Sequence, residues 1–122
     1  MFNDYIEVKN LSLEKCLEDQ FTLNSNRFLL ETLVSNLLTN AIRHNLKNGS
    51  ISIELINQTL IIKNSGNLPL NTDNLFKRFS VSASGSTNSG LGLAIVKEIC
   101  DRSLWTASYS FENSQHVFSI KF

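Results

Sequence analysis

The stretch that decides the fold is residues 36–45, NLLTNAIRHN, which sets amides and cationic groups beside an apolar stripe. Apolar side chains in and before this stretch recur at steps of three and four residues: Leu30, Val34, Leu37, Leu38 and Ala41. Such a period is typical of an amphipathic helix. We predict a helix that is capped by Asn26, runs to about Asn45 and ends in the turn of residues 47–50.

Four polar side chains of this predicted helix would form one row. At about 100° per residue, they fall within roughly a third of the helix circumference: Asn36, Asn40, Arg43 and His44. An asparagine amide oxygen can bind Mg²⁺, which usually shares its ligands with phosphate, and arginine pairs with phosphate oxygens. The alternative interpretation is that both asparagines are simply solvated, although asparagine is a poor helix former. A polar row beside an apolar stripe is well placed to line a cleft.

A second informative stretch is residues 89–96, SGLGLAIV, a glycine turn that opens another helix. We predict this helix from Leu91 to about Arg102. Unpaired N–H groups and the dipole at a helix start bind anions, and glycines let the backbone approach phosphates closely. A glycine pair of this kind is also common in ordinary tight turns. The serine- and glycine-rich residues 80–89 would form either a lid over a bound nucleotide or a linker.

The rest of the chain alternates between strand and turn patterns. Strands are predicted at residues 5–9, 20–23, 51–56, 60–63, 105–111 and 116–122, with tight turns at 57–58 and 112–114. A brief helix is expected at Leu11–Leu17 with Ser12 as its cap, and a short amphipathic turn or helix at Leu75–Phe79. Helices interspersed with hairpins predict an α/β two-layer sandwich, in which a mixed, mostly antiparallel sheet packs against about three helices.

Composition narrows the class of protein. The chain has 122 residues, enough for one domain, and its 11 basic residues balance its 11 acidic ones. We therefore expect no nucleic-acid partner held by charge alone. No apolar run approaches the roughly 20 residues of a membrane span, and the first residues lack the pattern of a signal peptide. Cys16 and Cys100 show no metal or redox spacing and are interpreted as reduced thiols of a cytoplasmic domain.

In their order and spacing, four segments resemble the motifs of the catalytic, ATP-binding domain of sensor histidine kinases. Residues 36–44 match the N box, Asn64–Gly66 the first glycine box, Phe76–Phe79 the F box and residues 89–96 the second glycine box. The resemblance covers about residues 26–122 and looks closest to Bacteroides-type kinases. It implies the Bergerat fold of the GHKL superfamily, which includes DNA gyrase and MutL, with ATP and Mg²⁺ as cofactors.

The resemblance implies a role for each residue of the N box. Asn40 would coordinate Mg²⁺, with Asn36 as a further ligand or just behind it. Arg43 would be a phosphate-binding cation, so that Asn40 and Arg43 would be the catalytic groups. His44 takes a position that often holds an aromatic residue beside the nucleotide.

The two glycine boxes would hold the base and the phosphates. Asn64 stands where the family usually has aspartate, and its amide oxygen would accept a hydrogen bond from the exocyclic amine of adenine. Gly66 would let the chain pass close to the base. The phosphates would be wrapped by Ser89, Gly90, Leu91, Gly92 and Leu93, under a lid formed by residues 80–89. Leu68 and Asn88 replace glycines of the family pattern, and the region before Asn26 is shorter than usual.

The implied activity is transfer of the γ-phosphoryl group of ATP to a histidine in two-component signal transduction. Neither His44 nor His116 is a credible phosphoacceptor, so we expect residues 1–122 to be one catalytic domain, with a shortened part at 1–25 and a motif-bearing core at 26–122. Its partners would be a separate histidine-bearing dimerisation domain and, indirectly, a response regulator. We expect the domain alone to be monomeric, inactive and cytoplasmic, within a sensor that could be membrane-bound. The alternatives are a serine kinase of the anti-sigma-factor type and a degenerate module that binds only nucleotide or a partner.

Overall fold

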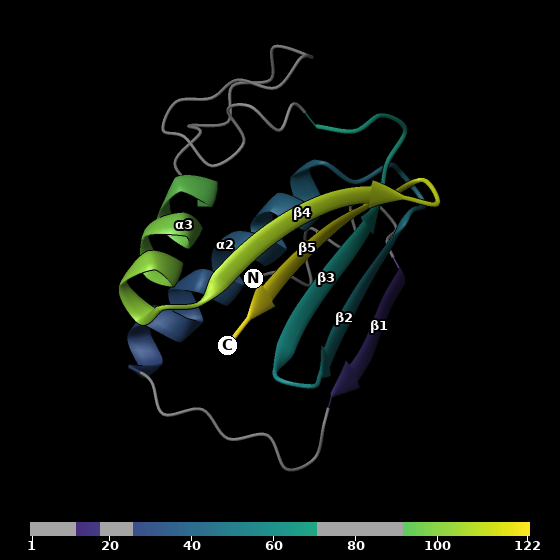
Figure 1. The fold of residues 1–122 in the computed structure, drawn as a ribbon. Helices are drawn as coiled ribbons and strands as arrows, with labels where there is room; N and C mark the ends of the chain where they lie inside the picture. The colour runs from purple at the N-terminus through teal and green to yellow at the C-terminus, as the bar shows by residue number, and fades with distance from the viewer. Residues whose placement is uncertain (1–11, 18–25, 71–91) are drawn as a thin grey trace.

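The computed structural model describes residues 12–17, 26–70 and 92–122, which form one five-stranded sheet and two helices (Figure 1). Their bounds in chain order are β1 (Ser12–Leu17), α2 (Arg27–Arg43), β2 (Ser50–Ile56), β3 (Thr59–Ser65), α3 (Gly92–Ser103), β4 (Thr106–Glu112) and β5 (Gln115–Lys121). The strand order is β1-β2-β3-β5-β4. β1 runs parallel to β2 and every other pair is antiparallel. The prediction of a mixed, mostly antiparallel sheet in a two-layer sandwich is confirmed.

Helix α2 follows the prediction closely. Its cap is Asn26, whose side-chain oxygen accepts hydrogen bonds from the backbone N–H groups of Phe28 (2.9 Å) and Leu29 (3.4 Å). These bonds satisfy donors that have no partner inside the helix. The helix ends at Arg43, and the backbone N–H of His44 still donates to the carbonyl of Asn40 over 3.0 Å.

The helix predicted at Leu11–Leu17 is wrong, because Ser12–Leu17 forms strand β1. The strand pairs with β2 from Ser12 opposite Ser50 to Leu17 opposite Leu55. A segment this short is a marginal helix in isolation, so the backbone hydrogen bonds offered by β2 decide its conformation. The predictions at residues 5–9, 20–23 and 75–79 lie outside the described residues.

Two hairpins set the register of the sheet. Asn57 and Gln58 have φ angles of 53° and 58°, and Asn113 and Ser114 have φ angles of 51° and 58°. Two consecutive residues in the left-handed region are the signature of a type I′ turn, whose twist matches that of the strands. The two hairpins join through β3 and β5, whose pairing places Asn64 directly opposite His116.

The core lies between the helices and one face of the sheet, as the two layers in Figure 1 show. It is made of Leu33, Leu37, Ala41, Ile42, Ile51, Leu60, Ile62, Val96, Ile99, Cys100, Phe118 and Ile120. The apolar row of the sheet continues into two polar side chains at one end of the strands, where Asn64 and His116 are also buried. Among the described residues, no helix has the length and apolar character needed to cross a membrane.

Candidate functional site

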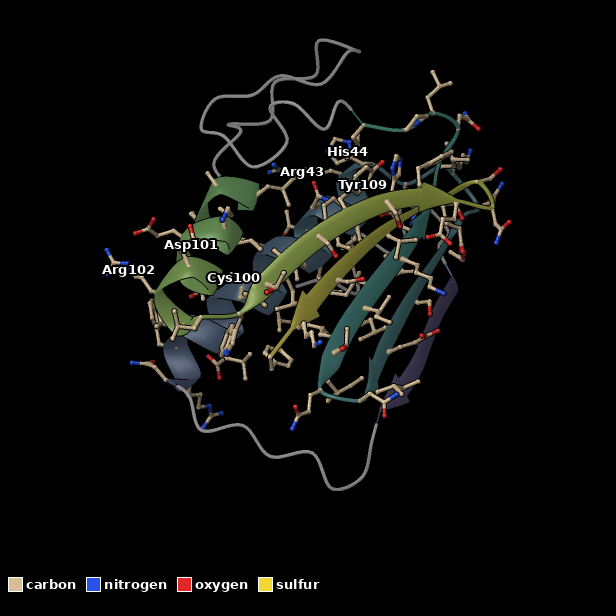
Figure 2. The ribbon with its side chains drawn as sticks, in the orientation of Figure 1. Arg43, His44, Cys100, Asp101, Arg102 and Tyr109 are labelled. Carbon is tan, nitrogen blue, oxygen red and sulfur yellow. The ribbon has the colours of Figure 1, made fainter. Side chains whose placement is uncertain are left out.

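The predicted site residues that the structure describes gather at one end of the sandwich. The last turn of α2, the end of β3 and the start of β5 meet there. Arg43, His44 and Tyr109 are seen together at this end in Figure 2. Burial lowers the pKa of His116, and electrostatic repulsion from His44, which follows α2, adds to this lowering.

Asn36 on α2 lies next to the start of α3. The Nδ2 group of Asn36 donates to the carbonyl of Thr32 over 2.8 Å, one turn earlier in the helix. The Oδ1 atom of Asn36 therefore points away from its own helix, and it would lie 3.3 Å from a Cβ atom placed on Gly92. A side chain at residue 92 would crowd this oxygen, so the glycine keeps the space between the two helices open.

Asn40 carries a buried amide nitrogen, Nδ2, that has no hydrogen-bond partner. A buried unpartnered donor costs about 1–3 kcal/mol, and such groups are uncommon in native proteins. Rotation of the amide by half a turn would exchange the nitrogen for the oxygen at this place. The Asn40 amide can therefore donate a hydrogen bond to an anionic oxygen through its nitrogen or, after this rotation, bind a cation through its oxygen.

The cationic part of the site is the end of α2. Arg43 is an exposed residue in the last turn, where the negative end of the helix dipole favours a positive charge. His44 follows as the C-cap and is half-buried.

Asn64 is fully buried at the end of β3, and its Oδ1 atom has no hydrogen-bond partner. Its Nδ2 group donates to the carbonyl of Ser65 over 3.0 Å, which fixes the amide with its oxygen as the free acceptor. Gly66 is also buried, and its N–H donates to the carbonyl of Ser114 over 2.9 Å. A Cβ atom on Gly66 would lie 2.3 Å from Nε2 of His116, so the imidazole occupies space that only glycine leaves.

A partly buried hydrogen-bonded chain behind Gly66 was not predicted from the sequence. The N–H of Leu70 donates to the Tyr109 hydroxyl over 2.9 Å, and this hydroxyl lies 2.8 Å from Nδ1 of His116. Burial raises the pKa of Tyr109 and lowers that of His116, with repulsion by His44 as a second cause for the histidine. The alternation of apolar and polar residues in β4 and β5 indicated which side chains share a face. Only the pairing of β3 with β5 shows that His116 lies opposite Asn64.

The remaining predicted site residues divide into two groups. Ser89, Gly90 and Leu91, with the predicted lid and the F box, lie outside the described residues. Gly92 begins α3, and Leu93 packs half-buried against the core, so its side chain has a structural role there. Leu68 is 76% exposed in the loop after β3, and its φ angle is not positive, so leucine is accommodated without backbone strain.

A shallow depression of about 320 Å³ runs along the outer surface of α2. Its lining consists of Phe28, Glu31, Thr32, Ser35 and Asn36, and does not include Asn64. Within the described ranges, no three side chains of histidine, cysteine, aspartate or glutamate come together as a metal cluster would require.

Comparison with known proteins identifies a family and several relatives of this chain. A family model described as "Histidine kinase-, DNA gyrase B-, and HSP90-like ATPase" matches residues 25–122. The sensor histidine kinase HprS of Escherichia coli strain K12 is 30% identical over 126 residues, which cover 96% of this chain and 28% of HprS. The heme sensor protein HssS of Staphylococcus saprophyticus is 31% identical over 121 residues, which cover 93% of this chain and 26% of HssS. The chain thus spans under a third of the length of these two relatives.

A solved structure supports the fold independently. The mycobacterial sensor histidine kinase MprB superposes with a TM-score of 0.79 over 98% of this chain and 88% of that chain, at 22% sequence identity. At this level of identity the likeness concerns the fold alone.

Proposed function

Because the chain belongs to the family of histidine kinase-, DNA gyrase B- and HSP90-like ATPases, we propose that it binds ATP with Mg²⁺ and donates the γ-phosphoryl group to a histidine of a separate dimerisation domain. The protein would act in two-component signal transduction, with a response regulator further along the relay. Its relatives HprS and HssS are described as a sensor histidine kinase and a heme sensor protein.

The observation that carries this proposal is the unpartnered Oδ1 atom of Asn64. A buried acceptor without a partner destabilises the free protein by about 1–3 kcal/mol, and the exocyclic amine of adenine would supply the missing donor. Gly66 supports this role, because the space left by its missing side chain holds the His116 imidazole at the same end of the sheet. Asn64 has a neutral amide where the family usually has a charged aspartate, so its hydrogen bond to the base would be a neutral one.

The phosphates and the metal would lie between α2 and α3. The Oδ1 atom of Asn36, the amide of Asn40 and the open space at Gly92 suit oxygen ligands and phosphate. Mg²⁺, when bound, neutralises the charge that develops on the phosphates. Arg43 would pair with phosphate oxygens, and the backbone at the glycine turn would hold the phosphate chain.

Phosphoryl transfer depends mainly on positioning and on charge stabilisation, so this site needs no strong base of its own. The accepting histidine would come from another domain. His116 is 3% exposed, and its Nδ1 atom is engaged by Tyr109. His44 caps α2. In this proposal both histidines serve as parts of the domain and neither is the phosphoacceptor.

The direct test is transfer of labelled phosphate from ATP to a helical histidine-bearing domain of a related kinase. We expect label that is lost in acid and stable in alkali, as phosphohistidine is. Acid-stable label on serine of a partner protein would favour the anti-sigma-factor type of kinase. Absence of label together with absence of nucleotide binding would favour a degenerate docking module.

The metal assignment has its own test. We expect Asn40→Ala to lower the affinity for a non-hydrolysable ATP analogue in Mg²⁺ about tenfold or more while its affinity in EDTA changes little. Ser35→Ala, on the same helix but outside the polar row, is the matched control. Unchanged Mg²⁺-dependent affinity in a folded Asn40→Ala variant would remove Asn40 from the metal site.

A further inference from the structure

Two buried polar side chains lie opposite each other at the end of the sheet where the base would bind. Asn64 on β3 is fully buried and His116 on β5 is 3% exposed. The register of the two strands pairs them directly. Directly paired residues of an antiparallel ladder carry their side chains on the same face, with Cβ atoms roughly 4.5–5.5 Å apart. One planar ligand can therefore reach both side chains.

The hydrogen bonds of Tyr109 determine which nitrogen of His116 carries the proton. The backbone N–H of Leu70 can only donate, so the Tyr109 oxygen accepts at 2.9 Å. The hydroxyl proton is then directed at Nδ1 of His116, 2.8 Å away. The reverse arrangement would bring two N–H groups onto one hydroxyl and leave its own proton to be placed elsewhere. Burial keeps the imidazole neutral by lowering its pKa, and a neutral imidazole that accepts at Nδ1 carries its proton on Nε2.

The Nε2 side of the ring lies beside Gly66, where an added Cβ atom would come within 2.3 Å of it. Gly66 follows Asn64 by two residues, so the Nε2–H donor and the unpartnered Oδ1 acceptor flank the same turn. Asn64 cannot easily present its own amide nitrogen instead, because Nδ2 already donates to the carbonyl of Ser65. The end of the sheet thus presents one fixed acceptor and one fixed donor.

We propose that His116 is a second specificity-determining residue of the base site, and that its Nε2–H donor acts with the Asn64 Oδ1 acceptor to select a 6-aminopurine. A 6-aminopurine offers an amine donor next to a ring-nitrogen acceptor, which complements this pair. A 6-oxopurine offers an acceptor where the amine would be, so that it places oxygen against the Oδ1 atom of Asn64. The inference rests on the proposed nucleotide site, and it assigns the base selectivity of that site to the pair of Asn64 and His116.

The test compares three proteins by calorimetry: the wild type, His116→Leu and His116→Gln. Leucine is apolar and lacks the N–H group, whereas glutamine places an amide donor at a similar reach. The ligands are non-hydrolysable analogues of ATP and GTP, and 1-deaza and 7-deaza forms of the ATP analogue. The affinity ratios are the readout, because a general loosening of the site would weaken all ligands together.

We expect the wild type to prefer adenine over guanine and to bind one of the two deaza analogues about three- to tenfold more weakly than the parent compound, the loss typical of one hydrogen bond. His116→Leu should lose the penalty for that deaza analogue, and His116→Gln should restore it in part. If His116→Leu retains the penalty, the inference is wrong. If the wild type binds no nucleotide at all, the proposed function fails instead.

A measurement on the free wild-type protein tests the same inference without any variant. The ¹⁵N chemical shifts of the His116 ring should show a protonated Nε2 and an accepting Nδ1 at pH 7. A ring protonated at Nδ1 would place an acceptor, in place of a donor, beside Gly66 and would overturn the inference.

Discussion

Substitution of Gly66 by alanine tests the packing of the site in one step. The added Cβ atom would lie 2.3 Å from Nε2, 2.6 Å from Cδ2 and 3.2 Å from Cε1 of His116. The φ angle of Gly66 lies outside the left-handed region, so the cost comes from this contact and not from the backbone. The ring cannot easily retreat, because it is 3% exposed and is held by Tyr109. Overpacking of this kind costs about 1–3 kcal/mol, and we expect Gly66→Ala to lower the free energy of unfolding by this amount.

The assay is urea unfolding followed by the fluorescence of Trp105, the one tryptophan of the chain. A double-mutant cycle with His116→Ala isolates the contact, because alanine at residue 116 removes the ring that the new methyl group would strike. In that background Gly66→Ala should cost little, since a glycine-to-alanine change at a compatible backbone is slightly favourable. The coupling energy should be about 1–3 kcal/mol.

The matched control is Gly92→Ala. Among the residues that the structure describes, its Cβ atom would meet the end of the Asn36 side chain, at 3.3 Å, and alanine favours a helix over glycine by up to about 1 kcal/mol. We expect its stability to be unchanged or slightly raised. Strictly additive effects of Gly66→Ala and His116→Ala would refute the reasoning, because they would show that the two residues do not share this space.

Three further predictions concern stability and reactivity. Leu104 follows α3 with a φ angle of 60° and is 91% exposed, so Leu104→Gly should relieve backbone strain and raise the free energy of unfolding by about 1 kcal/mol; a loss of stability in urea would contradict this. Because the folded pKa of His116 is lowered below 6.5, the unfolded chain binds more protons, and stability should be full above pH 6.5 and fall as the pH drops from there through the lowered pKa. His116→Leu should show a smaller fall between pH 7.5 and 5.5, and an equal fall would assign the effect to other groups. Burial raises the pKa of Cys100 to about 11, so alkylation of this thiol at pH 8, read by peptide mass spectrometry, should be slow until urea unfolds the protein; rapid alkylation of the folded chain would show that Cys100 is accessible.

Local signals in the sequence predicted most of the described elements. The apolar period of α2, its asparagine cap and the turn at Asn57–Gln58 are all properties of neighbouring residues, and the structure confirms them. Strand β1 was predicted as a helix because its conformation depends on pairing with β2, which lies far along the chain. Local propensity in so short a segment is too weak to reveal such a partner.

In the candidate site, too, features set by neighbouring residues could be predicted and features set by long-range pairing could not. The amides of α2 and the turn at Asn64 could be identified from their order and spacing. The positions of Tyr109 and His116 behind the turn could not, because they follow from the long-range pairing of β3 with β5 and from the register of the β4–β5 hairpin. The sequence excluded His116 only as a phosphoacceptor. The structure shows that it is buried and that it lies opposite Asn64.

Calorimetric titration with a non-hydrolysable ATP analogue shows whether this end of the sandwich is a nucleotide site. The titration is made on the folded wild-type protein, once in Mg²⁺ and once in EDTA, with Asn64→Leu as a variant that lacks the acceptor but keeps a similar volume. We predict 1:1 binding that is tighter in Mg²⁺ and is weakened about tenfold or more by Asn64→Leu. A well-folded wild-type protein that binds no nucleotide in either buffer would contradict the account.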